Sequence, residues 1–169
     1  MVKSPRIDTG VLLAAGLELM KQNGKPLTKK PRAGSAKLYT LPNGDMVRVR
    51  TCNDHKLIVV TNSPSPEDAT LNIEETDEKA HWLLIVMPVV ARTPGKIIAY
   101  LVPTEVAVAG TRKHQRDWLS RLPKTAGDNK TWVLYFGEKR PAEVTDFQEE
   151  WSRYLLSGDV LVGPTGTLV

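Results

Sequence analysis

Apolar and polar residues alternate most clearly at positions 46–51, which read MVRVRT. Successive side chains of a β-strand point to opposite faces, so this segment predicts a strand that carries Arg48 and Arg50 on one face. A shorter strand is expected at 38–41. The Pro-Asn-Gly-Asp sequence at 42–45 lies between the two, and Asn-Gly favours the tight turn of a hairpin.

Four further segments predict the remaining strands. Leu57–Val60 is an unbroken apolar run, typical of a central strand buried on both faces, and we expect it to complete an antiparallel meander with the first two strands. The segments 81–90 and 96–102 flank a Pro-Gly turn and predict a pair of strands, and 131–136 predicts a short one. The strands together predict a central mixed sheet.

Helical spacing of apolar residues marks three other segments. The first, 8–23, has Asp8 or Thr9 as its cap and a glycine after its last turn. The second, Thr104–Arg121, follows a proline that suits the first position of a helix, and a third is expected from Pro141 to about position 156. The fold class predicted is therefore mixed α/β, with helices flanking the sheet.

Length and composition agree with one soluble domain. The chain has 169 residues, a single cysteine and no run near the ~18 apolar residues that a membrane helix needs. Its N-terminus lacks the apolar core of a secretory signal. We expect a cytoplasmic protein without a membrane partner, with one domain over 1–158 and a tail, 159–169, that either adds an edge strand or is mobile.

The net charge of +4 is small, but opposite charges are segregated along the chain. Basic residues gather at 21–56 and 112–124, and acidic residues at 67–78 and 143–150. Such asymmetry either attracts a polyanion to one side of the molecule or reflects solvated faces with no partner. If the partner is DNA, the residues expected to contact it are Lys29, Lys30, Arg32, Arg48, Arg50, Arg112, Lys113 and Arg116.

Several enzyme chemistries find little support in the sequence. Cys52 lies in a predicted turn, the three histidines are scattered, and there is no Gly-x-Ser-x-Gly elbow. A zinc site needs several Cys or His residues at short spacing, and nucleotide-binding glycine loops have their own fixed spacing; neither pattern occurs.

Four motifs follow one another between Gly10 and Leu119. They are Gly16-Leu17-Glu18 in the first helix, Val47–Thr51 in the alternating strand, Trp82–Val86, and Ala99–Val106 at a strand-to-helix turn. Their order resembles the restriction-endonuclease-like PD-(D/E)xK nuclease superfamily, closest to its homing-endonuclease-type and Mrr-like branch. The resemblance implies a fold in which carboxylates and a lysine hold Mg²⁺ and activate water for phosphodiester hydrolysis.

The sequence departs from that family at the catalytic positions. The expected aspartate falls near Tyr39 or Thr40, and Arg48 and Arg50 replace the metal-binding Glu or Gln and the lysine. Arginine does not ligate a cation, and its guanidinium stays protonated. The resemblance thus implies a degenerate site at Glu18, Thr40, Arg48 and Arg50 that holds no metal and can still bind phosphate.

A second register of the same motif preserves the chemistry. Asp45 followed by Asp54-His55-Lys56 matches D-x8-D-x-K and would hold Mg²⁺. Both aspartates lie in predicted turns, whereas the family's triplet ends an apolar strand. We therefore favour the degenerate register.

Three functions follow from these observations. The first hypothesis is a non-catalytic protein that binds double-stranded DNA. The second is an active Mg²⁺-dependent DNA endonuclease that uses Asp45, Asp54 and Lys56. The third is a protein-interaction module, in which the acidic segment Glu67–Glu78 engages a basic protein. A homodimer is expected by analogy with relatives of the resembled fold.

Overall fold

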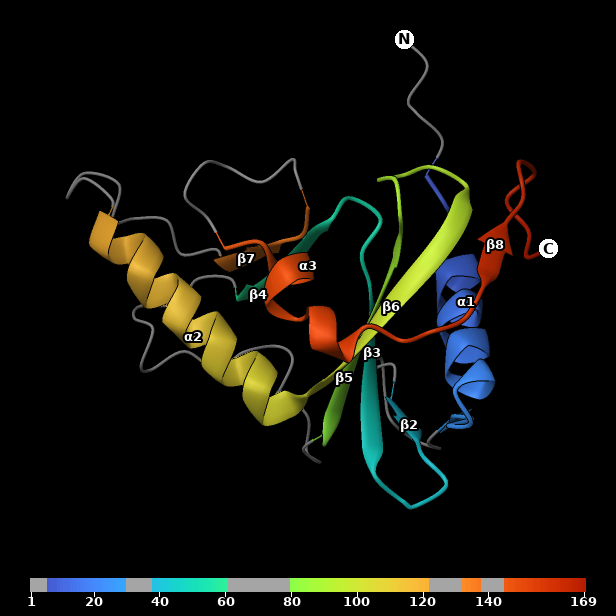
Figure 1. Ribbon diagram of the computed structural model, residues 1–169, viewed down its shortest axis with the longest axis horizontal. Coiled ribbons are helices and arrows are strands. Elements are labelled where there is room, and N and C mark those ends of the chain that lie inside the picture. Colours follow the sequence, from blue (N-terminus) through green and yellow to red (C-terminus); the bar gives the residue numbers. More distant parts are fainter. Residues whose placement is uncertain (1–5, 30–37, 61–79, 122–131, 138–144) are drawn as a thin grey trace, which may run out of the picture.

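The computed structural model describes residues 6–29, 38–60, 80–121, 132–137 and 145–169. Its elements, in chain order, are α1 (Thr9–Gln22), β1 (Thr28–Lys29), β2 (Leu38–Thr40), β3 (Met46–Thr51), β4 (Lys56–Val60), β5 (Trp82–Pro88), β6 (Gly95–Pro103), α2 (Thr104–Arg121), β7 (Trp132–Tyr135), α3 (Phe147–Glu150), the 3-10 turn η2 (Ser152–Tyr154) and β8 (Val160–Val162). They form a mixed α/β fold around a central mixed sheet, as the sequence predicts (Figure 1).

The central sheet has six strands in the order β1-β2-β3-β5-β6-β8. β3 and β5 run parallel, with Val47 opposite Trp82 and Thr51 opposite Val86, and the other neighbours are antiparallel. β5 is buried from Leu83 to Pro88. This burial on both faces explains its unbroken apolar sequence.

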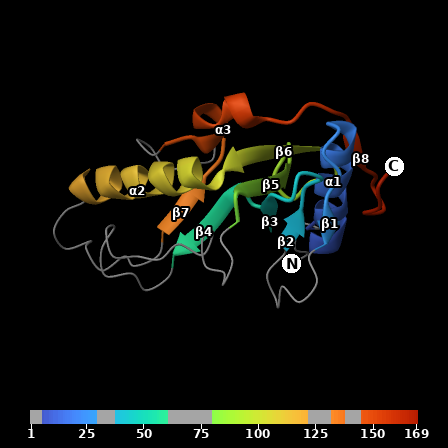
Figure 2. The same cartoon turned by 90° about the horizontal axis from the view of Figure 1, so that it is seen from below.

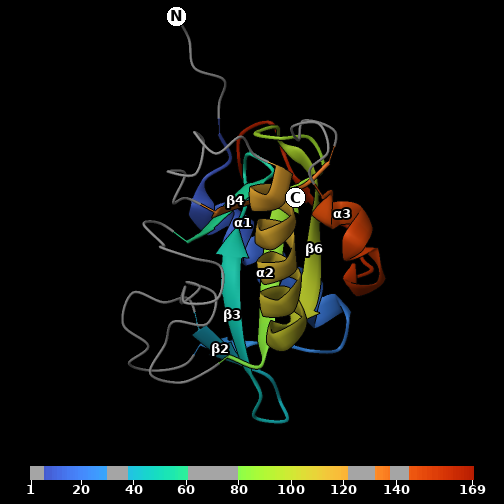
Figure 3. The same ribbon diagram turned by 90° about the vertical axis from the view of Figure 1, so that its left-hand side faces the viewer.

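Each face of the central sheet has its own apolar core. One cluster joins α1 to Val47, Val49, Leu84 and Val86. The other joins α2, β4, β7 and α3 to Leu83 and the residues that share its face. The sheet therefore separates α1 from α2, as Figure 2 and Figure 3 show.

β4 is the main correction to the predicted fold. The backbone N–H of Cys52 donates to the carbonyl of Val86 (2.8 Å), which extends the β3–β5 contact, and His55 at φ 57° then turns the chain. β4 pairs with β7 in a separate two-stranded sheet. The prediction that Leu57–Val60 is a central strand of the meander is wrong, because the longer apolar β5 lies beside β3.

The first two helices lie where the sequence predicts them. The Asp8 carboxylate caps α1 by accepting from the backbone N–H groups of Gly10 (2.8 Å) and Val11 (3.3 Å). α2 has the predicted bounds, Thr104–Arg121. Within the described residues, no helix is long and apolar enough to cross a membrane.

The C-terminal region differs from its prediction. Of the helix expected from Pro141 to about position 156, residues 141–144 lie outside the described part, and the rest is the short α3 followed by η2. The Asp146 carboxylate accepts from the N–H groups of Gln148 (2.9 Å) and Gly137 (2.8 Å), and so starts the helix at Phe147. In the tail, β8 pairs with β6 as an edge strand, one of the two outcomes expected.

Candidate functional site

Arg48 and Arg50 lie on the face of β3 that points away from α1. Val47 and Val49 are buried in the α1 cluster, so the alternation of the strand puts both arginines on the opposite face. Their register partners on β5 are Leu83 and Ile85, which belong to the α2 cluster. Both arginines are partly buried, and the predicted placement on a shared face is confirmed.

The pKa of Arg50 reflects its partly buried position beside Arg48. Burial lowers the pKa of the Arg50 guanidinium below its ordinary value, and the charge of Arg48 lowers it further, while Cys52 acts in the opposite direction. The two guanidinium groups are therefore close enough for their charges to interact.

The remaining positions of the degenerate register are divided between the two faces. Thr40 shares the face of the arginines, since it lies opposite Met46, and its hydroxyl donates to the carbonyl of Thr28 (3.4 Å). Glu18 belongs to α1, and that helix lies on the other side of the sheet (Figure 3). The structure thus brings together Thr40, Arg48 and Arg50 but not Glu18.

The residues of the second register, Asp45, Asp54 and Lys56, do not lie together at one site. Asp45 precedes β3 and Asp54 follows it, and the six-residue strand between them is about 20 Å long at ~3.3 Å per residue. Lys56 is exposed, with its Nζ 6.0 Å from the centre of the Tyr135 ring. Among the described residues, no three His, Cys, Asp or Glu side chains gather as a metal site requires.

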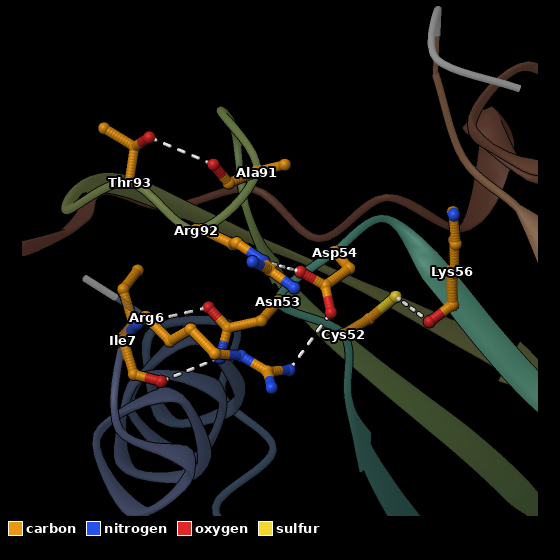
Figure 4. A network of polar contacts seen from close by, with 9 residues as sticks. All are labelled: Arg6, Ile7, Cys52, Asn53, Asp54, Lys56, Ala91, Arg92 and Thr93. Atoms are coloured by element: carbon orange, nitrogen blue, oxygen red, sulfur yellow. Dashed lines mark hydrogen bonds and ion pairs between the residues drawn. The ribbon is translucent and has the colours of Figure 1, made fainter. Parts of the chain in front are cut away.

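Asp54 forms ion pairs with two arginines from other segments of the fold (Figure 4). Its carboxylate accepts from Arg92 in the β5–β6 turn and from Arg6 ahead of α1 (3.0 Å to Arg6). The hydrogen bond from Arg92 lowers the pKa of Asp54, and the charge of Arg6 lowers it further. Asp54 therefore joins three segments of the fold.

Asn53, next to Asp54, also links this loop to the segment ahead of α1. The Asn53 side chain donates to the carbonyl of Ile7 (2.7 Å) and accepts from its N–H (3.3 Å), which imitates strand pairing. Cys52 is buried, its Sγ donates to the carbonyl of Lys56 (3.0 Å), and burial raises the pKa of its thiol to about 12. Such a thiol forms little thiolate near neutral pH, which makes it a poor nucleophile.

The basic residues expected to contact DNA do not all lie on one face of the sheet. Lys29 lies directly opposite Tyr39, which is buried in the α1 cluster, so Lys29 is on the face away from Arg48. Lys30 and Arg32 lie outside the described residues. On α2, Arg116 is four residues from Arg112 and three residues from Lys113, so the three basic residues are neighbours on one side of the helix.

An open cleft of about 880 Å³ lies where α2 leaves the sheet. It is lined by residues from the starts of β3 and β5 and from the first turns of α2. They are Asp45, Ala80, His81, Trp82, Pro103, Thr104, Glu105, Val108, Ala109 and Arg112. Because the cleft is formed by segments far apart in the sequence, no local pattern predicts it, although the turn at Asp45 and the helix start at Pro103 are both evident in the sequence.

Hydrogen bonds join the segments that line this cleft. The indole N–H of Trp82 donates to Oδ2 of Asp45 (3.1 Å), and the backbone N–H of Met46 donates to Nδ1 of His81 (3.0 Å). The N–H of Thr104 donates to the carbonyl of His81 (3.0 Å). The Thr104 hydroxyl oxygen is buried and has no hydrogen-bond partner within the described part of the chain.

Comparison with known proteins gives little further information. Neither a protein-family model nor a curated protein matches the sequence. The crystal structure of MepB aligns with 78% of this chain and 85% of its own, at 13% sequence identity and a TM-score of 0.37. A likeness at this level carries no argument about function.

Proposed function

We propose that this protein binds double-stranded DNA without cleaving it. The carrying observation is the position of Arg48 and Arg50, which are partly buried on one face of β3 at the positions where the resembled nucleases place a metal ligand and a lysine. Guanidinium groups form paired hydrogen bonds with phosphate oxygens. In this proposal, side-chain charge replaces the charge of the metal ion.

Two arginines of α2 extend the proposed contact. Arg112 lines the cleft together with Asp45, the residue that precedes β3, and Arg116 follows one turn later on the same side of the helix. The phosphate-contacting set that we propose is therefore Arg48, Arg50, Arg112 and Arg116.

The proposed absence of cleavage rests on the carboxylates. Asp54 already accepts hydrogen bonds from two arginines, and the length of β3 separates it from Asp45. A nuclease of the resembled type needs both carboxylates within reach of the same metal ion.

The test is binding of a fluorescein-labelled duplex at low salt, followed by anisotropy. Neutralisation of both β3 arginines, Arg48→Gln with Arg50→Gln, should weaken binding about tenfold, which is ~1.4 kcal/mol. The matched control is Lys21→Gln with Lys25→Gln, which removes the same charge from exposed positions at the end of α1. Equal losses in the two double variants would show that only net charge matters and would overturn the assignment.

A protein-interaction module is the second candidate. Half of the residues that line the cleft are apolar, namely Ala80, Trp82, Pro103, Val108 and Ala109. Absence of duplex binding at low salt would favour this function over DNA binding.

A further inference from the structure

We propose that two copies of this chain associate through an exposed row of side chains at one end of the central sheet, on the face opposite α1. The row crosses three neighbouring strands, from Val89 after β5, through Lys96 of β6, to Leu161 of β8. This inference is independent of the proposed DNA binding, because it concerns another part of the sheet and is tested without DNA.

Strand register places the three side chains of the row next to one another. The backbone N–H of Val89 donates to the carbonyl of Lys96 (2.9 Å), which continues the β5–β6 register, and Lys96 lies opposite Leu161. Residues directly opposite each other in antiparallel strands share a face. Val160 and Val162 are buried in the α1 cluster, so Leu161 and the rest of the row belong to the other face.

The row lies beyond the part of this face that the helices cover. Met87, two residues before Val89, is fully buried, and Nε2 of Gln148 in α3 donates to its sulfur atom (3.6 Å). Val89 is 45% exposed and Leu161 is 42% exposed. A single exposed apolar side chain is ordinary, whereas contiguous exposed apolar surface is typical of an interaction site.

The outer edge of β8 already has hydrogen-bond partners. The carbonyl of Leu161 accepts from the N–H of Val169 (3.0 Å), and the carbonyl of Thr167 accepts from the N–H of Gly163 (2.8 Å). A second copy therefore meets the face of the row and does not add a strand at these groups. Val169 lies opposite Leu161, so it lengthens the apolar row on the same face.

An aspartate on the same face complements Lys96. The backbone N–H and carbonyl of Asp159 face Gln22 of α1, away from β6. The carbonyl of Leu161 also faces away from β6, so the two residues are in the same phase of the strand and Asp159 shares the face of Leu161. Lys96 and Asp159 are exposed, and neither forms an ion pair within the described residues.

This pair of opposite charges favours a second copy of the chain as the partner. In a two-fold interface the same patch meets itself, so a contact of Lys96 with Asp159 of the other copy implies the reverse contact by symmetry. An unrelated partner would need both opposite charges in a matching arrangement. The row is far smaller than a standard interface of ~20–30 residues per partner, so we expect a weak dimer with a dissociation constant of roughly 10–100 µM.

Sedimentation equilibrium at protein concentrations below and above this range tests the association. Leu161→Asp should weaken it at least about tenfold, because it puts an unpaired carboxylate into the apolar contact. Leu168→Asp is the matched control, since Leu168 is 40% exposed and lies opposite Val162, on the α1 face. Circular dichroism verifies that both variants are folded. A monomer at every concentration, or equal loss of association in the two variants, would overturn the inference and leave the proposed DNA binding intact.

Exchange of the two charges tests the symmetry of the interface. Lys96→Glu and Asp159→Lys should each weaken association at least about threefold, because like charges then meet twice. An equimolar mixture of these variants should associate again, since every charge contact between the two different copies then joins opposite charges. Mixing leaves the contacts within each chain unchanged, so recovery identifies a contact between chains.

The control for this exchange changes the net charge equally at the other side of the molecule. Lys21→Glu, at the end of α1, and Glu105→Lys, at the start of α2, are exposed positions outside the row. Each should leave association unchanged, alone and in the mixture. If the mixture of the Lys96 and Asp159 variants stays as monomeric as each variant alone, the two-fold interface through this row is excluded.

Discussion

Asp54 is the residue whose environment yields the clearest prediction about stability. Hydrogen bonding to Arg92 and the charge of Arg6 depress the pKa of its carboxyl group in the folded protein. A depressed folded-state pKa contributes stability above the unfolded-state pKa of ~3.9, and this contribution is lost as the pH falls through the folded-state value. Its ion pairs are partly exposed, so salt screens them and the effect is small.

We predict that Asp54→Asn lowers the free energy of unfolding at pH 7 and that the difference from the unsubstituted protein shrinks as the pH falls from about 5 to about 2. Urea unfolding at several pH values measures it. Asp159→Asn is the control, because Asp159 is exposed and its carboxylate is not part of this junction. A difference that stays constant across this range would show that Asp54 acts through packing and not through its charge.

At the level of elements, the sequence predicted best what local interactions determine. α1 begins at a capping aspartate and α2 follows a proline, and both signals lie next to the helix that they start. The placement of Arg48 and Arg50 on one face follows from the period of a single strand. These features could be derived without knowledge of distant partners.

Features that depend on distant partners could not be derived in the same way. β4 has an apolar sequence that suits a central strand, but β5 competes for the place beside β3 and has more residues to pair. The start of α3 depends on Asp146, which also binds the N–H of Gly137. The cleft needs the starts of β3, β5 and α2 at the same edge of the sheet, which no single segment indicates.

Because α1 packs closely on β5, we predict an effect of Gly16→Ala on stability that is opposite to the effect expected from helix propensity. Alanine favours a helix by ~1 kcal/mol over glycine, yet a Cβ added at Gly16 would overlap the side chain of Val86. We predict that Gly16→Ala lowers the free energy of unfolding by about 1–2 kcal/mol, since overpacking a core typically costs ~1–3 kcal/mol. Chemical denaturation measures this change.

Gly110→Ala in α2 is the matched control for this substitution. Its added Cβ would lie 3.7 Å from Trp151, an ordinary contact, so we expect a gain in stability of up to ~1 kcal/mol. Val86→Ala should relieve the cost of Gly16→Ala in the double variant. If Gly16→Ala stabilises the protein as much as Gly110→Ala does, the result would contradict the close contact between Gly16 of α1 and Val86 of β5.

At the scale of the whole molecule, the six-stranded sheet divides the candidate residues between two faces. Glu18 and Lys29 belong to the α1 face, while Thr40, Arg48 and Arg50 belong to the α2 face. We predict no plasmid cleavage in Mg²⁺ or in Mn²⁺, because the carboxylates that would hold the metal ion do not converge. Cleavage that is lost in Asp54→Ala, in a variant shown by circular dichroism to be folded, would restore the D-x8-D-x-K site.

The salt dependence of duplex binding tests the central claim most directly. If about four to six phosphates are neutralised, a plot of log K against log salt concentration should have a slope of roughly −4 to −5. Removing the charges of Arg48 and Arg50 should make the slope shallower by roughly 2, at about −0.9 per phosphate contact, and the Lys21 and Lys25 control should leave it unchanged. A slope that is the same with and without the two β3 arginines, or no binding at low salt, would contradict the claim that this face binds DNA.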